Sequence, residues 1–559
     1  MKYFFEHFEN GICIDKPQRI TTDESILAFN TRATGLRFLL INPPIREWSY
    51  PNIEPIGLAY IASIAIMDGH KVSILDLNAL RKKPIDDMIQ YEVEMYKLIE
   101  QSVTEFEPDV IGIGGIITQY AKIKKILHMC KTIKPKCITI LGGGILSCMP
   151  EYMLKHLDAD VGVREEGEIT ISEVLARIEN NLTFNGCKGA ITKDKDKNII
   201  DNGLRTSLVN GENGLDNLPW PARSLFHYDN IYKKNPVGHI NFKQKWLSGK
   251  PDENTPYSMS MIASRGCPYS CDYCYAQYLG TKYRLRTPAN VVDEMQYAKN
   301  NYNVQYIHFL DDLFMTSYKW TIDFCNELQH RKETDGFEIE WGGTCRTNII
   351  ADDVVRAKKE GRKNILEMGY DVGMRNASYG IETASTTILE NIDKSGQTPE
   401  KIKIAVDETR RVLGYIDPSF MMGSPGETKE TIKETVSFCK ENSIDVEVIF
   451  FTTAYPATPF WQLALDKGLI GKAVHEKKCA ADDDTIEKYF LLLGEQGDNI
   501  RTNFSDALDD EELENLTNLA IHELSAKNKL KHTYIHPHTG ETQIKVKAKV
   551  ARGASFANI

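Results

Sequence analysis

Short apolar runs recur at regular intervals in the N-terminal part of the chain, and they constrain the fold more than any other feature. The runs are Arg37–Asn42, Lys71–Leu77, Asp109–Ile116 and Cys137–Gly144, and helix-like segments such as GLAYIASIAIMDG separate them. This alternation predicts a doubly wound, mostly parallel α/β sheet. Ligands bind such sheets beyond the carboxyl ends of the strands, where Gly-rich turns let backbone amides approach them.

A second series of strand-like runs begins after Asn213–Phe226, a segment rich in Pro, Gly and Asp that we interpret as an interdomain linker. The runs are Ser258–Gly266, Tyr306–Asp312, Ile339–Thr347, Ala377–Thr383, Pro418–Glu427 and Val448–Pro459. Helix-like segments again lie between them. A chain of 559 residues with this pattern is expected to form two large α/β domains and a smaller tail.

Three cysteines stand close together after the first run of this second series. The loop RGCPYSCDYCYA contains Cys267, Cys271 and Cys274. Both a structural zinc site and a four-cysteine cluster need a fourth ligand, and neither Cys nor His lies nearby in the sequence. A cubic 4Fe-4S cluster held by three cysteines would leave one iron open to a small molecule. The alternatives are a buried loop with three thiols, or a zinc site completed by a distant residue such as His308.

The cysteine spacing, with Tyr273 directly before the third cysteine, resembles the signature of the radical S-adenosylmethionine (SAM) enzymes. In that family the open iron binds the amino and carboxylate groups of SAM, and one-electron reduction cleaves SAM to a 5'-deoxyadenosyl radical. The resemblance implies a partial (β/α)6 barrel with its chemistry at the carboxyl ends of the strands. It also implies an electron donor such as flavodoxin or ferredoxin, and an oxygen-sensitive cluster.

The resemblance also identifies candidate SAM-binding residues at successive strand ends. They are Tyr273, Asp312, Arg346, Glu382, Gly423 and Glu427. Arg346 and Glu382 would hold the ribose or the methionine end of SAM, and Gly423 to Glu427 would border the adenosine. Asp312 and Glu427 also fit a helix N-cap or a surface ion pair. Tyr455, after the last strand, is the candidate catalytic residue facing the substrate, or else a packed aromatic side chain.

Loops of the N-terminal series resemble the cobalamin-binding domain that precedes the radical domain in one radical SAM subfamily, the class B methyltransferase type. The motifs are NPP, GIGGIIT, LGGGILSCMPEY and EEGE. The implied cobalamin-binding residues are Pro43, Pro44, Thr118, Gly142, Gly143, Gly144, Glu166, Gly167 and Glu168. The three glycines alone would indicate only a turn. The combination of motifs makes the resemblance.

Many cobalamin domains supply a lower cobalt ligand from a His in the loop after the first strand, but here that loop reads NPPIREWSYPN. It contains no histidine. Asp68-Gly69-His70 lies between a helix and the second strand, and we interpret it as a turn. The resemblance therefore implies cobalamin without a protein histidine ligand, which favours two-electron cycling between cob(I)alamin and methylcobalamin.

Composition limits the partners and the compartment. The net charge is -11, and no long Lys/Arg stripe is interleaved with aromatics, so we expect no nucleic-acid binding. No apolar run approaches the length of about 20 residues that spans a bilayer, and the N-terminus carries acids where a signal peptide is basic. Twelve cysteines without a disulfide-like pattern are typical of a reducing compartment. We therefore predict a cytoplasmic protein without membrane partners.

The predicted domains are an N-terminal extension (1–35), a cobalamin-binding domain (36–212), a linker (213–255), a radical SAM barrel (256–470) and a substrate-capping region (471–559). The last region is expected to be mostly helical. It contains FSDALDDEELENLTNLAIHEL, an amphipathic helix for which Ser505 or Asp506 would be the N-cap. The sequence says nothing of the oligomeric state.

The resemblance implies a radical SAM C-methyltransferase. It would move a methyl group from SAM through methylcobalamin to an unactivated carbon of a small metabolite or natural-product intermediate. The same cofactors would also suit ring formation or rearrangement without methyl transfer, as in anaerobic porphyrin cyclases. A different class of function would be a non-catalytic cobalamin or iron-sulfur sensor, although no helix-turn-helix pattern or output module is evident.

Overall fold

The computed structural model describes most of the chain. The described residues are 23–45, 51–80, 88–208, 211, 214–226, 228, 231–234, 256–275, 282–446, 449–475, 481–493, 501–525, 533–535 and 542–544. They form two compact units. The first comprises the described residues within 1–236, 257–260 and 284–303, and the second comprises those within 237–256, 261–283 and 304–559. None of the described helices combines the length and the apolarity needed to cross a membrane.

The first unit is built on a seven-stranded sheet with the order β2-β1-β3-β4-β5-β6-β7. The strands are β1 (Arg37–Asn42), β2 (Lys71–Asp76), β3 (Val110–Gly114), β4 (Ile138–Gly142), β5 (Val161–Val163), β6 (Ala190–Lys193) and β7 (Ile199–Asp201). The first five pair in parallel, while β6 and β7 form an antiparallel hairpin on β5. The predicted mostly parallel sheet is confirmed.

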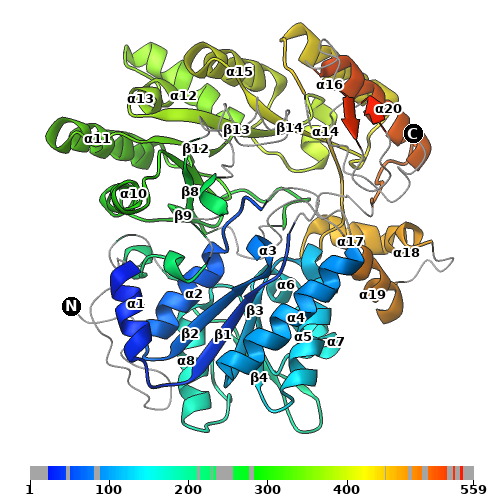
Figure 1. The fold of residues 1–559 in the computed structure, drawn as a ribbon. Helices are drawn as coiled ribbons and strands as arrows, with labels where there is room; N and C mark the ends of the chain where they lie inside the picture. The colour runs from blue at the N-terminus through cyan, green and yellow to red at the C-terminus, as the bar shows by residue number, and fades with distance from the viewer. Residues whose placement is uncertain are drawn as a thin grey trace. The chain divides into compact units, whose positions relative to one another are not determined.

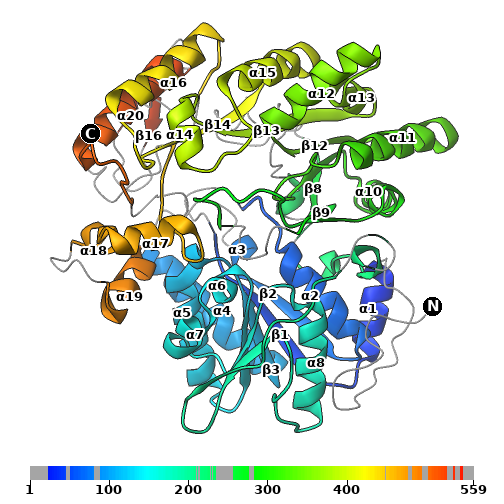
Figure 2. The same ribbon diagram turned by 180° about the vertical axis from the view of Figure 1, so that it is seen from behind.

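Helices cover both faces of this sheet (Figures 1 and 2). α2 (Ile56–Met67) and α8 (Gly167–Glu179) lie on one face, and α4 (Met88–Phe106) and α5 (Tyr120–Ile133) lie on the other. Alternate strand residues such as Phe38 and Leu40 pack against the α2 and α8 side. Because both faces of the strands are buried, the strands read in sequence as continuous apolar runs.

Shorter elements complete the first unit. They are α1 (Asp23–Arg32), α3 (Leu77–Leu80), η1 (Ile117–Gln119), α6 (Gly144–Cys148), α7 (Pro150–His156), η3 (Leu215–Asn217), η4 (Arg223–Leu225), η5 (Tyr232–Lys234), β10 (Arg284–Leu285) and α10 (Pro288–Tyr302). The linker residue Ala222 donates its amide to the Ala59 carbonyl on α2 at 3.1 Å, so this part of the predicted linker is docked on the unit.

The second unit contains β11 to β15 of a six-stranded sheet with the order β15-β14-β13-β12-β11-β8. The strands are β8 (Ser258–Met261), β11 (Tyr306–Phe309), β12 (Glu340–Cys345), β13 (Met374–Glu382), β14 (Asp417–Met422) and β15 (Ile449–Phe451), with the short β9 (Ser264–Arg265) after β8. β11 to β15 pair in parallel. All six predicted strands are present, although Val448 lies outside the described residues.

Helices lie along one face of this sheet, as expected of a partial α/β barrel (Figure 1). They are α11 (Tyr318–Asp335), α12 (Thr347–Glu360), α13 (Ile365–Asp371), α15 (Pro399–Leu413) and α16 (Lys429–Glu441), and the short α14 (Thr386–Asn391) follows β13. Two rings of α11, Trp320 and Phe324, pack with those of Phe309, Phe314 and Trp341. This aromatic cluster anchors β11 and β12, whose ends carry candidate site residues.

α17 (Pro459–Asp466) and α18 (Leu469–Ala473) follow the last strand of this sheet. The predicted tail (471–559) contains α19 (Asp483–Leu492) and α20 (Asp510–Leu524), so its described part is mostly helical, as predicted. A small antiparallel hairpin, β16 (Thr533–Ile535) and β17 (Thr542–Ile544), was not predicted. The predicted N-cap of α20 was wrong. Asp509 caps the helix in a capping box with Glu512, while the Ser505 hydroxyl accepts from the amides of the turn before it. The four successive acids at 509–512 favour the later start.

Phe324→Ala is expected to destabilise the second unit. Phe324 is fully buried, and its ring lies 5.1 Å from that of Trp320 and 5.3 Å from that of Trp341, centroid to centroid. The cavity and the lost contacts should lower the free energy of unfolding by about 3–5 kcal/mol, measured by denaturant titration. Val355→Ala is the control, because Val355 is 43% exposed on α12. Equal losses in the two variants would contradict this account of the core.

Candidate functional site

The carboxyl ends of β1, β3, β4 and β5 share one edge of the first sheet, because these strands are parallel. The chain passes from β1 to β2 on one side and then to β3 on the other side of β1. Ligands of doubly wound sheets bind at such a switch point. All the predicted cobalamin-binding residues end or follow one of these four strands, so the structure brings them to a common edge.

Gln119, which sequence reasoning missed, ties the loop after β1 to the loop after β3. Its side-chain Nε2 donates to the carbonyls of Pro43 at 3.1 Å and Pro44 at 3.2 Å, and its Oε1 accepts from the Ile116 amide at 3.0 Å. Gln119 is buried, and these bonds give its side-chain amide the hydrogen-bond partners that a buried polar group needs. A buried glutamine directly after the predicted Thr118 has no distinctive sequence signal.

Gly143 allows the loops after β3 and β4 to approach each other closely. Its φ is +80°, and a Cβ there would lie 2.7 Å from the Gly115 carbonyl oxygen. That carbonyl accepts from the Ile145 amide at 3.0 Å, at the start of α6. Of the three predicted glycines, Gly143 is thus the one whose backbone requires glycine. Gly142 ends β4 and Gly144 begins α6.

The Thr118 hydroxyl is a buried polar atom at this edge, and it has no hydrogen-bond partner among the described residues. Buried hydroxyl groups are rarely left without a partner, because an unpaired one costs free energy. A polar ligand on this edge would supply the partner. Together with the close backbone approach at Gly143, the unpaired hydroxyl fits a cofactor of the expected kind, and the assignment of Thr118 to cobalamin stays a prediction.

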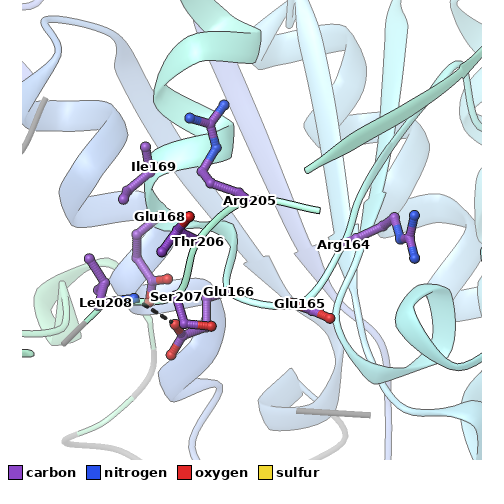
Figure 3. A pocket seen from close by; sticks show the side chains of 9 residues that line it. All are labelled: Arg164, Glu165, Glu166, Glu168, Ile169, Arg205, Thr206, Ser207 and Leu208. Carbon is purple, nitrogen blue, oxygen red and sulfur yellow. Dashed lines mark hydrogen bonds between the residues drawn. The ribbon is translucent and has the colours of Figure 1, made fainter. Parts of the chain in front are cut away.

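The EEGE segment begins at the end of β5 and enters α8. The Ser147 hydroxyl accepts from the Glu165 amide at 2.7 Å and so links this segment to the loop after β4. Glu166 accepts from Arg284 Nη1 at 2.5 Å and from the Leu208 amide at 3.3 Å. Figure 3 shows Glu166 directed toward Leu208 in a pocket. The pocket is lined by Arg164, Glu165, Glu166, Glu168, Ile169, Arg205, Thr206, Ser207 and Leu208. Glu166 thus already has protein partners.

His70 lies at the opposite edge of the sheet, directly before β2. It is 2% exposed, and its Nδ1 accepts from the Leu36 amide at 3.2 Å. The preceding Gly69 has φ +89°, in the left-handed region that ends a helix. The interpretation of this tripeptide as a turn is confirmed. Residues 46–50 of the loop after β1 lie outside the described residues.

The cysteine loop lies in the second unit after β8. Cys271 is buried, whereas Cys267 and Cys274 are partly exposed. Arg346 donates from Nη1 to the Cys271 sulfur at 3.5 Å. Burial raises the pKa of the Cys267 thiol, and the nearby Asp312 and Cys271 add to this. A guanidinium beside these sulfurs would balance the negative charge of thiolates or of a cluster.

Single-ion binding finds no support in the described part of the chain. It contains no group of three or more His, Cys, Asp or Glu side chains that could hold one metal ion, so the zinc alternative with His308 has no geometric basis there. In a cubic cluster each cysteine binds its own iron, and three sulfurs therefore need not converge on one point. Three available thiols in one loop fit that arrangement.

Arg346 directly follows β12, at the predicted strand end, but its contacts were not foreseen. Its guanidinium stacks on the Tyr269 ring, 3.6 Å from the centroid. Its Nε donates to Asn348 Oδ1 at 2.9 Å, and its Nη2 donates to the Ser395 carbonyl at 2.7 Å. With the bond to Cys271, each guanidinium nitrogen has a protein partner. Arg346 therefore supports the cysteine loop, and its predicted contact with SAM stays untested.

Glu382 ends β13 as predicted and binds Lys394, which sequence reasoning missed. Its Oε1 accepts from Lys394 Nζ at 2.9 Å and from the Tyr273 hydroxyl at 3.0 Å, and Lys394 also donates to that hydroxyl at 2.7 Å. Burial raises the pKa of Tyr273 well above 10, and the Glu382 carboxylate adds to this. Glu382 has φ +66°, and a Cβ on Gly380 would lie within 2.4 Å of its Oε1. Strain of this kind is typical of functional positions.

The two aspartates at the end of β11 differ in their surroundings. Asp311 is buried and accepts from the amide of Ala263 at 3.1 Å and from the Ser264 hydroxyl, which holds the chain just before the cysteine loop. Burial raises the pKa of Asp311 to about 6. Asp312 is exposed and carries the open carboxylate of the pair. The predicted residue, Asp312, is therefore the one that a ligand could reach.

Glu427 closes the GSPGE turn after β14. It is 2% exposed, and it accepts from the amides of Gly423 at 2.5 Å and Ser424 at 3.1 Å. Burial raises its pKa to about 7. The tail packs on the turn: the Phe504 amide donates to the Gly423 carbonyl at 2.9 Å, and the Ser505 hydroxyl donates to the Glu427 carbonyl at 2.7 Å. Glu427 therefore shapes the turn from within, and it is not a surface ion pair.

Tyr455 follows β15 and is partly buried. Its ring lies 5.7 Å from that of Tyr275, which directly follows the last cysteine of the loop. An aromatic pair beside the cysteine loop is compatible with a position facing a substrate. The predicted catalytic role of Tyr455 remains a prediction.

Gly143→Ala is expected to weaken cobalamin binding by about tenfold or more, because the added Cβ would push apart the loops after β3 and β4. The measurement is the corrin absorbance retained by the protein after gel filtration. Gly69→Ala is a matched control. Gly69 has a similar φ of +89°, but a Cβ there would meet no atom within 4 Å. If both variants retain as much corrin as the wild type, the Gly143 contact is not part of the site.

Glu427→Gln is expected to change the pH dependence of stability. Because burial raises the Glu427 pKa from 4.5 to about 7, the folded protein keeps a proton that the unfolded chain loses between these values. The free energy of unfolding should therefore fall as pH rises through this window, by about 3 kcal/mol for this group. Denaturant titrations across the window should show a shallower fall in Glu427→Gln. The control is Glu434→Gln, an exposed position on the following helix, and a wild-type slope in Glu427→Gln would refute the argument.

Two family models match the chain. The B12 binding domain matches residues 47–175, and the radical SAM superfamily matches residues 261–439. The first match begins after β1 and covers β2 to β5 with the loops after β3, β4 and β5, and the second covers the cysteine loop and β11 to β14.

The chain is similar to known proteins over most of its length. An uncharacterized methyltransferase of Pyrococcus horikoshii is 27% identical over 78% of this chain and 84% of its own. An anaerobic magnesium-protoporphyrin IX monomethyl ester cyclase of Rubrivivax gelatinosus is 24% identical over 77% of this chain and 70% of its own. The solved structure of the radical SAM methyltransferase TsrM from Kitasatospora setae, with cobalamin and a [4Fe-4S] cluster bound, superposes with a TM-score of 0.63 at 18% identity, covering 88% of this chain and 90% of that one.

The TsrM likeness supports the fold of both units. The two family matches stand in this order on one chain, and each includes loops at the carboxyl ends of parallel strands. The protein therefore carries a B12-binding domain ahead of a radical SAM domain.

Proposed function

We propose that this protein is a cobalamin-dependent radical SAM methyltransferase that moves a methyl group from SAM, by way of cobalamin, to an unactivated carbon of a small molecule. The main support is a combination of two features. A three-cysteine loop follows β8 and β9, and the loops after β1, β3, β4 and β5 meet at one edge of the first unit's sheet, which we call the cofactor-type edge. The similarity to a methyltransferase over most of both chains agrees with this reaction.

The residues divide into three binding groups. Cys267, Cys271 and Cys274 would hold a 4Fe-4S cluster. The loops that carry Pro43, Pro44, Thr118 and Gly142–Gly144 would hold cobalamin, and the strand ends from Asp312 to Glu427 would hold SAM. When bound, the cluster and SAM would supply a radical, and cobalamin would supply the methyl group.

The chain's own residues would position these groups and balance their charge. Arg346 brings a buried cation to Cys271, and Asp311 holds the backbone that leads into the cysteine loop. Lys394 and Tyr273 hold one oxygen of Glu382, and the second oxygen, which has no hydrogen-bond partner among the described residues, would accept from donors such as the ribose hydroxyl groups. Buried, fixed dipoles of this kind need little reorganisation during a reaction.

The lower face of cobalamin would have no histidine from the loop after β1, since NPPIREWSYPN contains none and His70 lies at the other edge of the sheet. An unligated lower face would favour the two-electron uptake of the methyl group from SAM at cobalt. We further propose that the open iron makes the enzyme oxygen-sensitive, that flavodoxin or ferredoxin reduces it, and that it works in the reducing cytoplasm.

The test is anaerobic incubation of the protein, carrying iron, sulfide and cobalamin, with dithionite and SAM labelled in its methyl group. We expect 5'-deoxyadenosine, S-adenosylhomocysteine and labelled methyl on the corrin, measured by mass spectrometry. Cys271→Ala should abolish 5'-deoxyadenosine formation, whereas Cys439→Ala, a buried cysteine on α16, should not. Absence of label on the corrin and in any product would refute methyl transfer.

Ring formation is the second candidate, and the similarity to the Rubrivivax gelatinosus cyclase favours it specifically. A cyclase would form 5'-deoxyadenosine without S-adenosylhomocysteine and without labelled corrin. A protein that forms none of these products would instead fit the sensor hypothesis. The pattern of SAM-derived products therefore separates the three functions before the substrate is known.

A further inference from the structure

The cysteine-bearing segment begins and ends at residues of the first unit. Residues 261–283 belong to the second unit, but the residues on either side, 257–260 and 284–303, belong to the first. The family match to the radical SAM superfamily spans this boundary, since it covers residues 261–439. Ser260 and Arg284 are thus the two points at which the chain that carries the cysteines leaves and rejoins the unit with the B12-binding match.

Ser260 is held on both sides of its backbone by buried ionic side chains. Its amide donates to Glu54 Oε1 at 2.9 Å, and its carbonyl accepts from Arg223 Nη2 at 2.8 Å. Glu54 and Arg223 are each 4% exposed, and the second carboxylate oxygen of Glu54 lies 3.7 Å from Arg223 Nε. Glu54 lies between β1 and α2 and so comes from the same loop as Pro43 and Pro44.

The same arginine reaches the helix that follows the cysteine segment. Arg223 Nη1 donates to Glu294 Oε1 on α10 at 2.8 Å, and Arg286 Nη1 donates to Glu294 Oε2 at 2.6 Å. All of these groups lie in the first unit and are buried. With Glu54, they form a network of two carboxylates and two guanidinium groups. Arg223 is the final residue of the LPWPAR sequence in the predicted linker.

Arg284 is held independently at the other end of the segment. It is 1% exposed, and its Nη1 donates to Glu166 Oε2 at 2.5 Å and to the Leu208 carbonyl at 3.3 Å. Glu166 belongs to the EEGE segment after β5. The two anchors therefore connect the ends of the cysteine segment to loops after two different strands of the cofactor-type edge.

Burying an ion pair in a protein interior costs free energy, because both charges lose their contact with water. Apolar residues of similar volume often stabilise a fold equally well or better, whereas loss of one partner leaves an uncompensated buried charge. What a buried ion pair adds is a fixed geometry, because its bonds are directional and few arrangements satisfy them. Two such anchors, one at each end of a single loop, fit a role in positioning better than a role in stability alone.

We infer that Arg223 and Arg284 are positioning residues that fix the two ends of the cysteine segment on the cobalamin-binding unit, through Glu54 and Glu166. The inference rests on the proposed function for its purpose, which is to hold the cluster at a constant distance from cobalamin. It goes beyond that function because neither arginine touches a cofactor in this account. The anchors themselves involve only protein atoms.

The first test is amide hydrogen exchange of the full-length protein without cofactors. Arg223→Gln should speed exchange in residues 256–266, and Arg284→Gln should speed it in residues 282–290, each by about tenfold or more. Arg284→Lys, which keeps the charge, should retain most of the protection. Arg177→Gln is the matched control, because Arg177 forms an equally buried ion pair with Glu173 on α8. It should speed exchange on α8 and leave both end segments unchanged.

Protection of residues 138–146 on β4 shows whether each variant is still folded, and the lysine variant remains informative if a glutamine variant is not. Unchanged exchange at both ends of the segment, or equal increases in Arg177→Gln, would overturn the inference. This result does not depend on the reaction, so it can fail while methyl transfer is confirmed, and the reverse.

A second measurement tests positioning separately from stability. In protein loaded with both cofactors, pulsed electron paramagnetic resonance gives the distance distribution between cob(II)alamin and the reduced cluster. Arg223→Gln and Arg284→Gln should broaden it while the individual spectra and the iron and cobalt contents stay those of the wild type. Arg177→Gln should leave it narrow. A distribution unchanged in both anchor variants would overturn the positioning role, whereas absence of either cofactor would count against the proposed function.

Discussion

Parallel pairing of strands is the constraint on which both candidate sites depend. In each sheet it forces the carboxyl ends of strands that are far apart in sequence onto one edge, where their loops meet. In the first unit the meeting is so close that Gly143 must lack a Cβ and that one glutamine, Gln119, bonds to two loops. In the second unit it brings Glu382 from β13 to Tyr273 of the cysteine loop. Residues on these loops that could take part in chemistry therefore lie close together, although they are far apart in the sequence.

Buried carboxylates define the second theme of the structure. Burial raises the pKa of Asp311 to about 6 and the pKa of Glu54 and Glu427 to about 7. Each of the three accepts a hydrogen bond from at least one backbone amide, and sequence analysis predicted this role for none of them. Asp311 and Glu54 hold the chain on either side of Met261, while Glu427 holds the turn after β14. Burial of these carboxylates costs free energy, while their hydrogen bonds fix the backbone at these positions.

Much of the fold and part of the site could be predicted because they are local. Strand β1 was predicted to the residue, the six strands of the second sheet were found, and the turn at His70 was recognised. The hydrogen-bond and stacking partners of the site residues were harder to predict. Arg346 was expected near SAM, but its stacking on Tyr269 depends on how the loop after β8 lies against β12. Lys394 and Gln119 went unnoticed, because a single lysine or glutamine has no pattern until the loop opposite it is in place.

The sequence by itself determined the identity of the two domains, their order and the three thiols. Strand periodicity and cysteine spacing are properties of short stretches of the sequence, and the two family matches also come from the sequence alone. Only the tertiary structure decided that Arg223 and Arg284 anchor the ends of the cysteine segment and that Glu166 binds an arginine more than one hundred residues away. The physical reason is that an ion pair gains its value from burial and geometry, and both exist only after the chain has folded.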